Sequence, residues 1–190
     1  MATITPATKL TYADLLLWPE DGQRHELIDG EHSVSGSPTV RHQRVLRDLF
    51  MALAAFVEQH GLGEVLFAPL DVLLSDHDVL EPDLFYVARE RSSLLAERCV
   101  HGAPDLVVEV RSQSTRTRDL GPKRSCYEKF GVAEYWVVDP DEETLDVFRQ
   151  SHAGGSGLHH VARLHRAAGG GPLTSPLFPG LALGLERIFR

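Results

Sequence analysis

The 190-residue chain contains no apolar run close to the roughly 20 residues that a membrane-spanning helix needs. Its first ten residues, MATITPATKL, lack the apolar core of a secretory signal. The two cysteines, Cys99 and Cys126, form no C-x-x-C pair and predict no disulfide framework. We therefore expect a protein of the reducing cytoplasm that has no membrane partner.

Positive charge is also scarce, because 19 Lys and Arg residues stand against 27 Asp and Glu residues and the net charge is −8. Proteins that bind nucleic acid non-specifically are usually basic, since neutralised phosphates supply much of the affinity. Any nucleic-acid contact must therefore use a local basic patch. Two segments offer one: Arg41, His42, Arg44 and Arg47, and then Arg111, Arg116, Arg118, Lys123, Arg124 and Lys129. Both segments also fit an ordinary solvated helix face.

Several catalytic motifs are missing. The chain has neither the G-x-x-x-x-G-K-[ST] phosphate loop nor the G-x-S-x-G nucleophile elbow. His159 and His160 would point to opposite faces of a strand and lack partners at zinc-ligand spacing. Nothing specific indicates a Ser/His/Asp triad, so the carboxylates are the best candidates for chemistry.

Local signals predict one α/β domain over residues 11–190, after a flexible N-terminus at residues 1–10. Thr11 should cap a short helix, Asp29-Gly30 should form the turn of a hairpin over 25–35, and Ser37 should cap a long helix that begins at Pro38 and ends at Gly61. The other predicted strands cover residues 64–68, 71–74, 83–87, 105–110, 134–139, 144–149 and 160–164, and the other predicted helices cover 92–98 and 120–130. This order predicts a central mixed β-sheet flanked by helices.

The predicted strand at 105–110 carries a carboxylate among apolar residues. A period of two places Leu106, Val108 and Val110 on one face, and Val107 and Glu109 on the other. An unpaired carboxylate in a dry interior costs several kcal/mol, so Glu109 must face a cation.

Asp83 and Lys123 are the residues that could account for the burial of the Glu109 carboxylate. If the strand at 83–87 neighbours the strand at 105–110, Asp83 and Glu109 converge at one end of the sheet. Two such carboxylates repel unless a cation lies between them, and Mg²⁺ typically takes one or two carboxylates with phosphate oxygens and waters. Alternatively, Glu109 pairs with Arg111 or with Lys123, which shares a helix face with Tyr127 and should pack toward the sheet.

Three ordered segments, EPDLFYV, APDLVVEVRSQST and RDLGPKRSCYEKFGVAEYWVVDP, resemble the Uma-type family of restriction endonuclease-like proteins in the PD-(D/E)XK nuclease-like superfamily. HELIDGE, SPTVRHQRV, FAPLDVLLSD and PLFPGLALGL match as well, so the resemblance covers nearly the whole chain from Thr11. It implies a restriction-endonuclease-like α/β fold and a Mg²⁺ (or Mn²⁺) site. It also implies hydrolysis of DNA phosphodiester bonds by a homodimer.

The resemblance assigns roles residue by residue. Asp83 falls on the metal-binding aspartate of the superfamily, and Glu109 falls on the acidic residue of its (D/E)XK element. Arg111 stands where that element has lysine, and the lysine role moves to Lys123 in the following helix. Glu26 in HELIDGE is matched to the additional glutamate of some superfamily members. The candidate DNA contacts are Arg41, His42, Arg111, Arg116 and Arg118.

Two other interpretations fit the same residues. The fold could be kept while cleavage is lost, which would leave a nucleic-acid-binding or regulatory module; the acidic net charge and Arg111 favour this alternative. The protein could instead be a metal-dependent hydrolase of another substrate, because a fold does not fix the substrate.

Overall fold

The computed structural model describes residues 8–19, 21–112, 120–151, 157–168 and 171–190. Its centre is a mixed sheet of six strands in the order β11-β10-β9-β8-β6-β3. These strands are β3 (Gly63–Phe67), β6 (Leu84–Ala88), β8 (Leu106–Val110), β9 (Glu134–Asp139), β10 (Thr144–Gln150) and β11 (Leu158–His165). β8 and β9 run parallel, whereas the other neighbours run antiparallel. The prediction of a mixed α/β architecture is confirmed.

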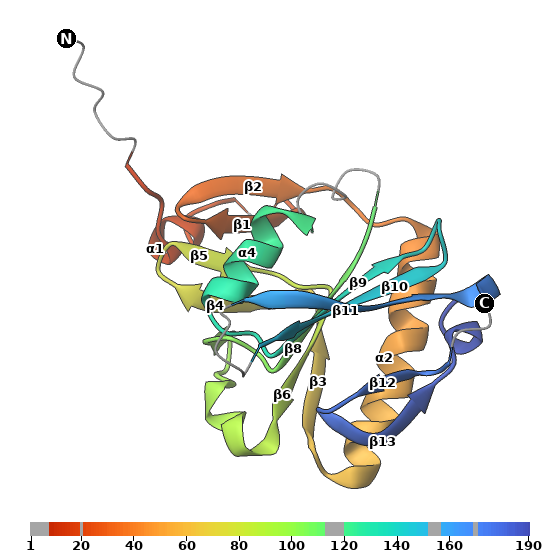
Figure 1. Ribbon diagram of the computed structural model, residues 1–190. Helices are drawn as coiled ribbons and strands as arrows, with labels where there is room; N and C mark the ends of the chain where they lie inside the picture. Colours follow the sequence, from red (N-terminus) through yellow and green to blue (C-terminus); the bar gives the residue numbers. More distant parts are fainter. Residues whose placement is uncertain (1–7, 20, 113–119, 152–156, 169–170) are drawn as a thin grey trace.

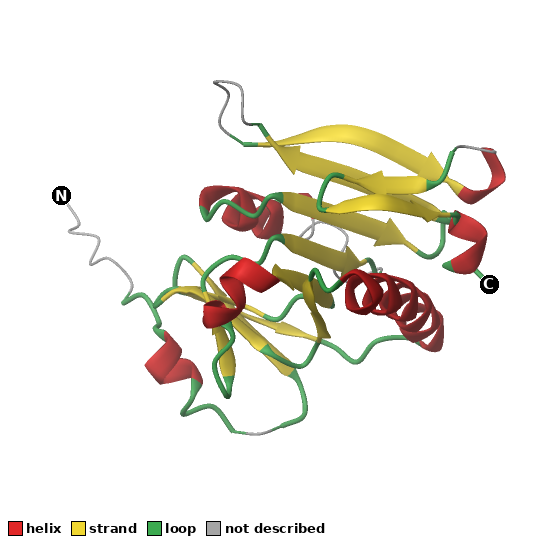
Figure 2. Cartoon of the chain, turned by 90° about the horizontal axis from the view of Figure 1, so that it is seen from below, coloured by secondary structure: helices red, strands yellow, loops and turns green. Residues whose placement is uncertain are grey.

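A second sheet of five strands, in the order β2-β1-β5-β4-β7, was not predicted as a separate unit. It contains β1 (Arg24–Ile28), β2 (Glu31–Ser35), β4 (Asp71–Ser75), β5 (Asp78–Leu80) and β7 (Cys99–His101). Figure 2 shows the two sheets as separate sets of strands. The predicted hairpin turn at Asp29-Gly30 is confirmed, with φ angles of 52° and 76° that suit a tight primed turn.

Three short strands are among the elements that the sequence pattern missed. β5 and β7 have three residues each, as does β12 (Leu173–Ser175), which pairs with β13 (Phe178–Leu183). Three residues are too few to show a period, so these strands depend on the neighbours that they pair with.

Helix α2 (Val40–His60) is the longest element, and its start corrects the prediction. The N-cap is Thr39 and not Ser37, because the Thr39 hydroxyl accepts a hydrogen bond from the backbone N–H of His42 at 3.2 Å. Pro38 therefore precedes the helix. Gly61 ends the helix as predicted, in the left-handed conformation at φ 60°.

The other helices are short. α1 (Tyr12–Leu15) begins at the predicted cap Thr11 with a capping box to Asp14, and α4 (Pro122–Lys129) lies within the predicted 120–130. Three 3₁₀ helices complete the fold: η1 (Arg89–Leu94), η2 (Arg166–Ala168) and η3 (Leu185–Arg187). In the described part of the chain, no helix has the length and apolar character needed to cross a bilayer.

Alternate residues of the central strand β8 contribute to two different cores. Val108 belongs to a cluster with Leu49 of α2 and Leu181 of β13. Val107 belongs to a second cluster with Tyr127 of α4 and Leu80 of β5. Figure 1 accordingly shows α2, β12 and β13 on one side of the central sheet, and α4 with the five-stranded sheet on the other. The face of β8 that carries Glu109 is therefore covered by α4 and by the second sheet.

Candidate active site

Asp83 and Glu109 lie at facing positions of neighbouring strands. β6 pairs antiparallel with β8, and Leu84 is opposite Val108. Extending this register by one residue places Asp83 opposite Glu109, and directly opposed residues project to the same face of a sheet. Each of the two residues is only 3% exposed. Both line one hollow of about 450 Å³, which we call the Asp83 pocket.

The carboxylate of Asp83 is surrounded by donors. Its Oδ1 accepts a hydrogen bond from Arg24 Nη1 at 2.8 Å, and its Oδ2 accepts one from the backbone N–H of Val110 at 2.8 Å. His42 Nε2 lies 3.1 Å from the same Oδ2. Burial acts to raise the pKa of Asp83, but the hydrogen bond and charge of His42 and the charges of Arg24 and Lys123 outweigh it and lower the pKa from 3.8 to about 2. Asp83 is therefore held as a carboxylate.

Lys123 joins two buried carboxylates. Its Nζ lies 2.9 Å from Glu109 Oε1 and 2.8 Å from Glu26 Oε1. Tyr127 donates a hydrogen bond from its hydroxyl to Glu109 Oε1 at 2.8 Å, and the backbone N–H of Glu81 donates one to Glu26 Oε1 at 3.0 Å. Glu109 thus faces a cation and a hydroxyl, which explains why its burial is tolerated.

Local sequence explains why Lys123 reaches this position. α4 begins at Pro122, whose fixed φ suits a first helical residue, so Lys123 lies in the first turn beside the end of β8. Tyr127, four residues later on the same face, is fully buried. Burial, and then the charge of Glu109, raise the pKa of Tyr127 well above its usual 10.0, so the hydroxyl remains a donor.

Arg24 and Glu81 belong to the site although the sequence did not point to them. Burial acts to lower the pKa of Arg24, but the charges of Asp83, Glu109 and Glu26 raise it, so the guanidinium stays charged. The carboxyl of Glu81 is buried, and its Oε2 has no hydrogen-bond partner within the described ranges. Burial, together with the charges of Asp71 and Glu26, raises its pKa from 4.5 to about 7. Alternation along β1 puts Arg24 and Glu26 on one face, which is the one signal that the sequence offered.

The predicted DNA contacts occupy different positions. Arg111 is 9% exposed at its side chain, and its Nη1 lies 3.3 Å from Asp139 Oδ2. Arg41 is exposed, lines the Asp83 pocket, and lies 3.5 Å from Asp141. His42 is 4% exposed and faces Asp83, so it forms part of the pocket wall. Arg116 and Arg118 lie outside the described residues.

The chemistry of the oxygen donors fits a hard divalent cation. Asp83 and Glu109 offer carboxylate oxygens to one pocket, which is the type of donor that Mg²⁺ and Mn²⁺ prefer. Within the described residues, no group of three or more His, Cys, Asp and Glu side chains is arranged to hold a metal. Any ion here would therefore need waters or substrate oxygens as further ligands, which is usual for Mg²⁺.

Comparison with known proteins identifies the family and the fold of the chain. The model of the Uma2 family, described as "Putative restriction endonuclease", matches residues 12–186. The chain has the same fold as a solved structure from Anabaena variabilis ATCC 29413 that is titled a "putative nuclease". The two chains are 19% identical with a TM-score of 0.71, over 95% of this chain and 97% of the other. A comparison with curated proteins finds no match. Since the family model spans nearly all of the sequence, the chain belongs to the Uma2 family.

Proposed function

We propose that the protein is a metal-dependent DNA endonuclease and that the Asp83 pocket is its active site. The observation that carries the proposal is the grouping around one pocket of Asp83, which directly precedes β6, Glu109 of β8 and Lys123 of α4. Membership of the Uma2 family supports the same reaction class. Two carboxylates and a lysine around a pocket are a suitable set for hydrolysis of a phosphodiester bond.

Asp83 and Glu109 would hold Mg²⁺ or Mn²⁺. When bound, the ion would supply an activated water and would offset charge on the scissile phosphate. Asp83 already accepts hydrogen bonds from Arg24 and from Val110 N–H. An ion bound there would repel the Arg24 guanidinium, and an Arg24 side chain displaced from Asp83 would be able to contact a phosphate oxygen.

Lys123 would donate hydrogen bonds to the phosphate oxygens as negative charge develops on them. Such a preorganised donor in a buried site contributes most where the charge changes during the reaction. Glu26 and Tyr127 act as positioning residues, because Glu26 holds the Lys123 amine and Tyr127 holds the Glu109 carboxylate. Arg41 and Arg111 add positive charge at the rim of the same pocket.

A second function, duplex binding without cleavage, is favoured by one specific observation. Arg24 donates a hydrogen bond to Asp83 at 2.8 Å, and His42 lies 3.1 Å from the same carboxylate, so side chains of the protein already contact both of its oxygens. A protein that used these contacts in place of a metal would keep the fold and the basic rim of the pocket. It would bind nucleic acid and leave it intact.

Cleavage of supercoiled plasmid DNA with Mg²⁺ or Mn²⁺ tests the proposal. We expect the wild-type protein to nick or linearise the plasmid and Glu109→Gln to lose this activity. Asp146→Asn is the matched control, because Asp146 is also a buried carboxylate. It lies in β10 and pairs with His160 of the edge strand β11, which is on the opposite side of β10 from β9. Binding without cleavage by the wild type would establish the second function, and cleavage by Glu109→Gln at the wild-type rate would place the reaction elsewhere.

The superfamily analogy also supports a homodimer, and the two cysteines without a C-x-x-C pair support a place in the reducing cytoplasm. Light scattering coupled to gel filtration tests the dimer, since the monomer mass is 21.0 kDa. A mass of one chain at the concentrations used for cleavage would contradict it.

A further inference from the structure

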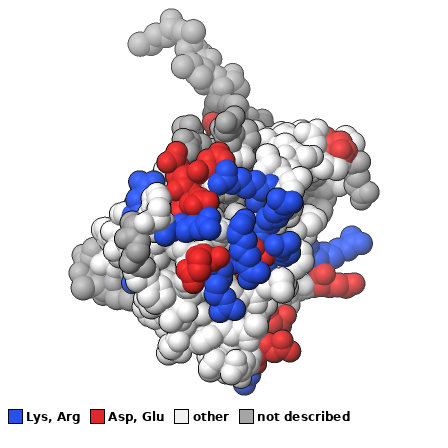
Figure 3. Space-filling view, turned by 90° about the vertical axis from the view of Figure 1, so that its right-hand side faces the viewer, with Lys and Arg blue, Asp and Glu red and all other residues white. Residues whose placement is uncertain are grey.

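A group of arginines lies on the face of the molecule that carries the start of α2 and the C-terminus. Arg41, Arg44 and Arg47 recur every three residues in the first turns of α2, and Arg187 and Arg190 lie at and after η3. All five are exposed. We call this set the arginine face. Figure 3 shows Lys and Arg side chains gathered across this side of the molecule, with acidic side chains beside them.

The arginine face is continuous with the Asp83 pocket. Arg41, Arg44 and Arg190 line a second hollow of about 220 Å³. The apolar residues of this hollow include Ile188 and Phe189, which are buried. Arg41 lines both hollows, so arginine side chains connect the pocket to the C-terminus, with Asp141 and Glu143 beside Arg41.

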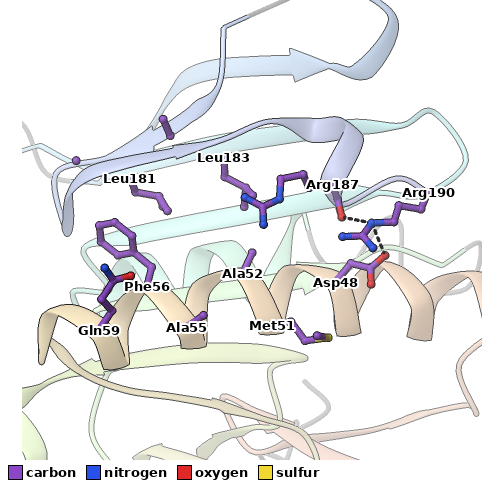
Figure 4. Close-up of a pocket in the computed structure, with 12 residues that line it drawn as sticks. Asp48, Met51, Ala52, Ala55, Phe56, Gln59, Leu181, Leu183, Arg187 and Arg190 are labelled. Atoms are coloured by element: carbon purple, nitrogen blue, oxygen red, sulfur yellow. Dashed lines mark hydrogen bonds and ion pairs between the residues drawn. The ribbon is translucent and has the colours of Figure 1, made fainter.

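Two of the arginines neutralise a buried carboxylate. Asp48 is 6% exposed, and it lies 2.7 Å from Arg47 Nη2 and 3.7 Å from Arg190 Nε. Figure 4 shows Arg187 and Arg190 at one end of the hollow between α2 and β13, with the dashed contact from Arg190 to Asp48. Arg47 and Arg190 are therefore already paired with Asp48, so substitutions there would also disturb this buried carboxylate.

The other members of the face have weak partners or none. Arg41 lies 3.5 Å from Asp141 and 3.7 Å from Glu143, and exposed ion pairs of this kind contribute little. The side chains of Arg44 and Arg187 make no hydrogen bond or ion pair with any described residue. In a chain of net charge −8, these cations are available to an external anion.

We propose that the arginine face binds the phosphodiester backbone of duplex DNA beside the scissile phosphate. This inference rests on the proposed nuclease function and names the surface that holds the flanking duplex. Arginine binds phosphate through a planar fork of donors, and phosphate contacts fix the register of a duplex without reading its sequence. Sites for single strands commonly stack bases on exposed aromatic rings, whereas the aromatic residue of this hollow, Phe189, is 3% exposed.

The double variant Arg44→Gln/Arg187→Gln tests this surface. It removes the two cations that have no partner among the described residues, and it leaves the Arg47 and Arg190 contacts to buried Asp48 in place. Arg98→Gln is the matched control, because Arg98 is exposed, makes no ion pair with a described residue, and precedes β7 in the five-stranded sheet. The measurement is the binding constant for a short linear duplex over a series of NaCl concentrations, without divalent metal.

A plot of log K against log salt has a negative slope, and each lost phosphate contact makes that slope less steep by about 0.9. The slope of the double variant should therefore be smaller in magnitude than that of the wild type by about 2. Arg98→Gln should keep the wild-type slope. A wild-type slope in the double variant, or a wild-type protein that does not bind the duplex, overturns the proposal. If a single strand gave the wild type the same salt slope as the duplex, and the double variant the same loss of slope, the assignment to duplex DNA would be overturned.

Cleavage of the same duplex with Mn²⁺, measured for wild type and for Lys123→Met, separates this inference from the proposed function. Lys123-dependent cleavage with an unchanged salt slope in the double variant would refute the arginine face alone. A reduced slope without any wild-type cleavage would refute the nuclease function alone.

Discussion

Lys123 in α4 lies 2.9 Å from Glu109 in β8, although Arg111 occupies the position two residues after Glu109. Arg111 lies instead 3.3 Å from Asp139 at the end of β9. The amine that pairs with the buried glutamate thus comes from the helix after the strand. This arrangement fits the resemblance, which assigned the lysine role to Lys123.

Metal binding should stabilise the fold through Asp83. Two carboxylates at facing positions gain from a shared cation, and a ligand that binds only the folded state at about 100 times its Kd adds about 2.7 kcal/mol. We expect Mg²⁺ or Mn²⁺ to raise the Tm of the wild type and of the control Asp146→Asn, and to leave the Tm of Asp83→Asn unchanged. Thermal unfolding with and without metal measures this, and an equal shift in Asp83→Asn would place the ion elsewhere.

Glu81 should make the metal-free protein less stable at high pH. Its pKa is about 7 in the folded state against 4.5 for the free side chain, so the folded state binds more protons between these values. Stability is therefore lost as pH rises from about 4.5 through about 7. Glu81→Gln should be more stable than wild type near pH 8, by about 1–3 kcal/mol, with a smaller difference near pH 4. Urea unfolding in the presence of a chelator measures the free energy of unfolding of both proteins at each pH. A difference between them that is the same at pH 4 and pH 8 would refute the role of Glu81.

Asp83 makes the stability of the fold depend on pH in the opposite direction. The contact with His42 is the largest of the effects that lower the pKa of Asp83. The folded pKa is about 2 against 3.8, so the stability that Asp83 contributes is present above about pH 4 and is lost as pH falls toward 2. His42→Gln should cost about 1.5–3 kcal/mol near pH 6, the range for a hydrogen bond to a charged group, and less near pH 2.5.

The matched control for His42→Gln is His160→Gln, since His160 lies 2.7 Å from Asp146 but its side chain is 47% exposed. It should cost less than about 1 kcal/mol. Acid titration of stability by circular dichroism compares the two variants. Equal losses would show that burial of the His42–Asp83 pair is unimportant.

The pattern of Glu109 and its neighbours predicted much of the site. Period-two alternation placed Glu109 and Val107 on one face of β8, and the structure has Val107 in the core that Tyr127 of α4 also joins. Three- and four-residue spacing placed Lys123 and Tyr127 on one helix face, and both are buried. These features are local, so the sequence carries them.

Arg24 and the start of α2 show what the sequence did not determine. Arg24 reaches Asp83 because the hairpin of one sheet packs beside the end of another, and no local period encodes that packing. Ser37 and Thr39 are both good N-caps, so local sequence alone does not choose between them. With Thr39 as the cap, His42 in the first turn of α2 lies 3.1 Å from Asp83.

Removal of Lys123 leaves Glu26 and Glu109 buried without their shared cation, which can cost 3–5 kcal/mol by itself. The test of Lys123 therefore needs the double variant Glu26→Gln/Lys123→Met, which restores the balance of charge, beside Lys123→Met. The Glu26→Gln single variant reports any effect of the first substitution. Circular dichroism selects the variants that remain folded at the assay temperature.

The most direct test of the active-site assignment is the cleavage rate at saturating DNA with Mn²⁺ for Lys123→Met, Glu26→Gln/Lys123→Met and Arg111→Met. We expect both Lys123 variants to lose on the order of a hundredfold in rate, comparable to the loss of one transition-state donor. We expect Arg111→Met to weaken DNA binding and to keep most of the rate at saturation. An inactive Arg111→Met beside an active, folded Lys123 variant would contradict the account and assign the catalytic role to Arg111.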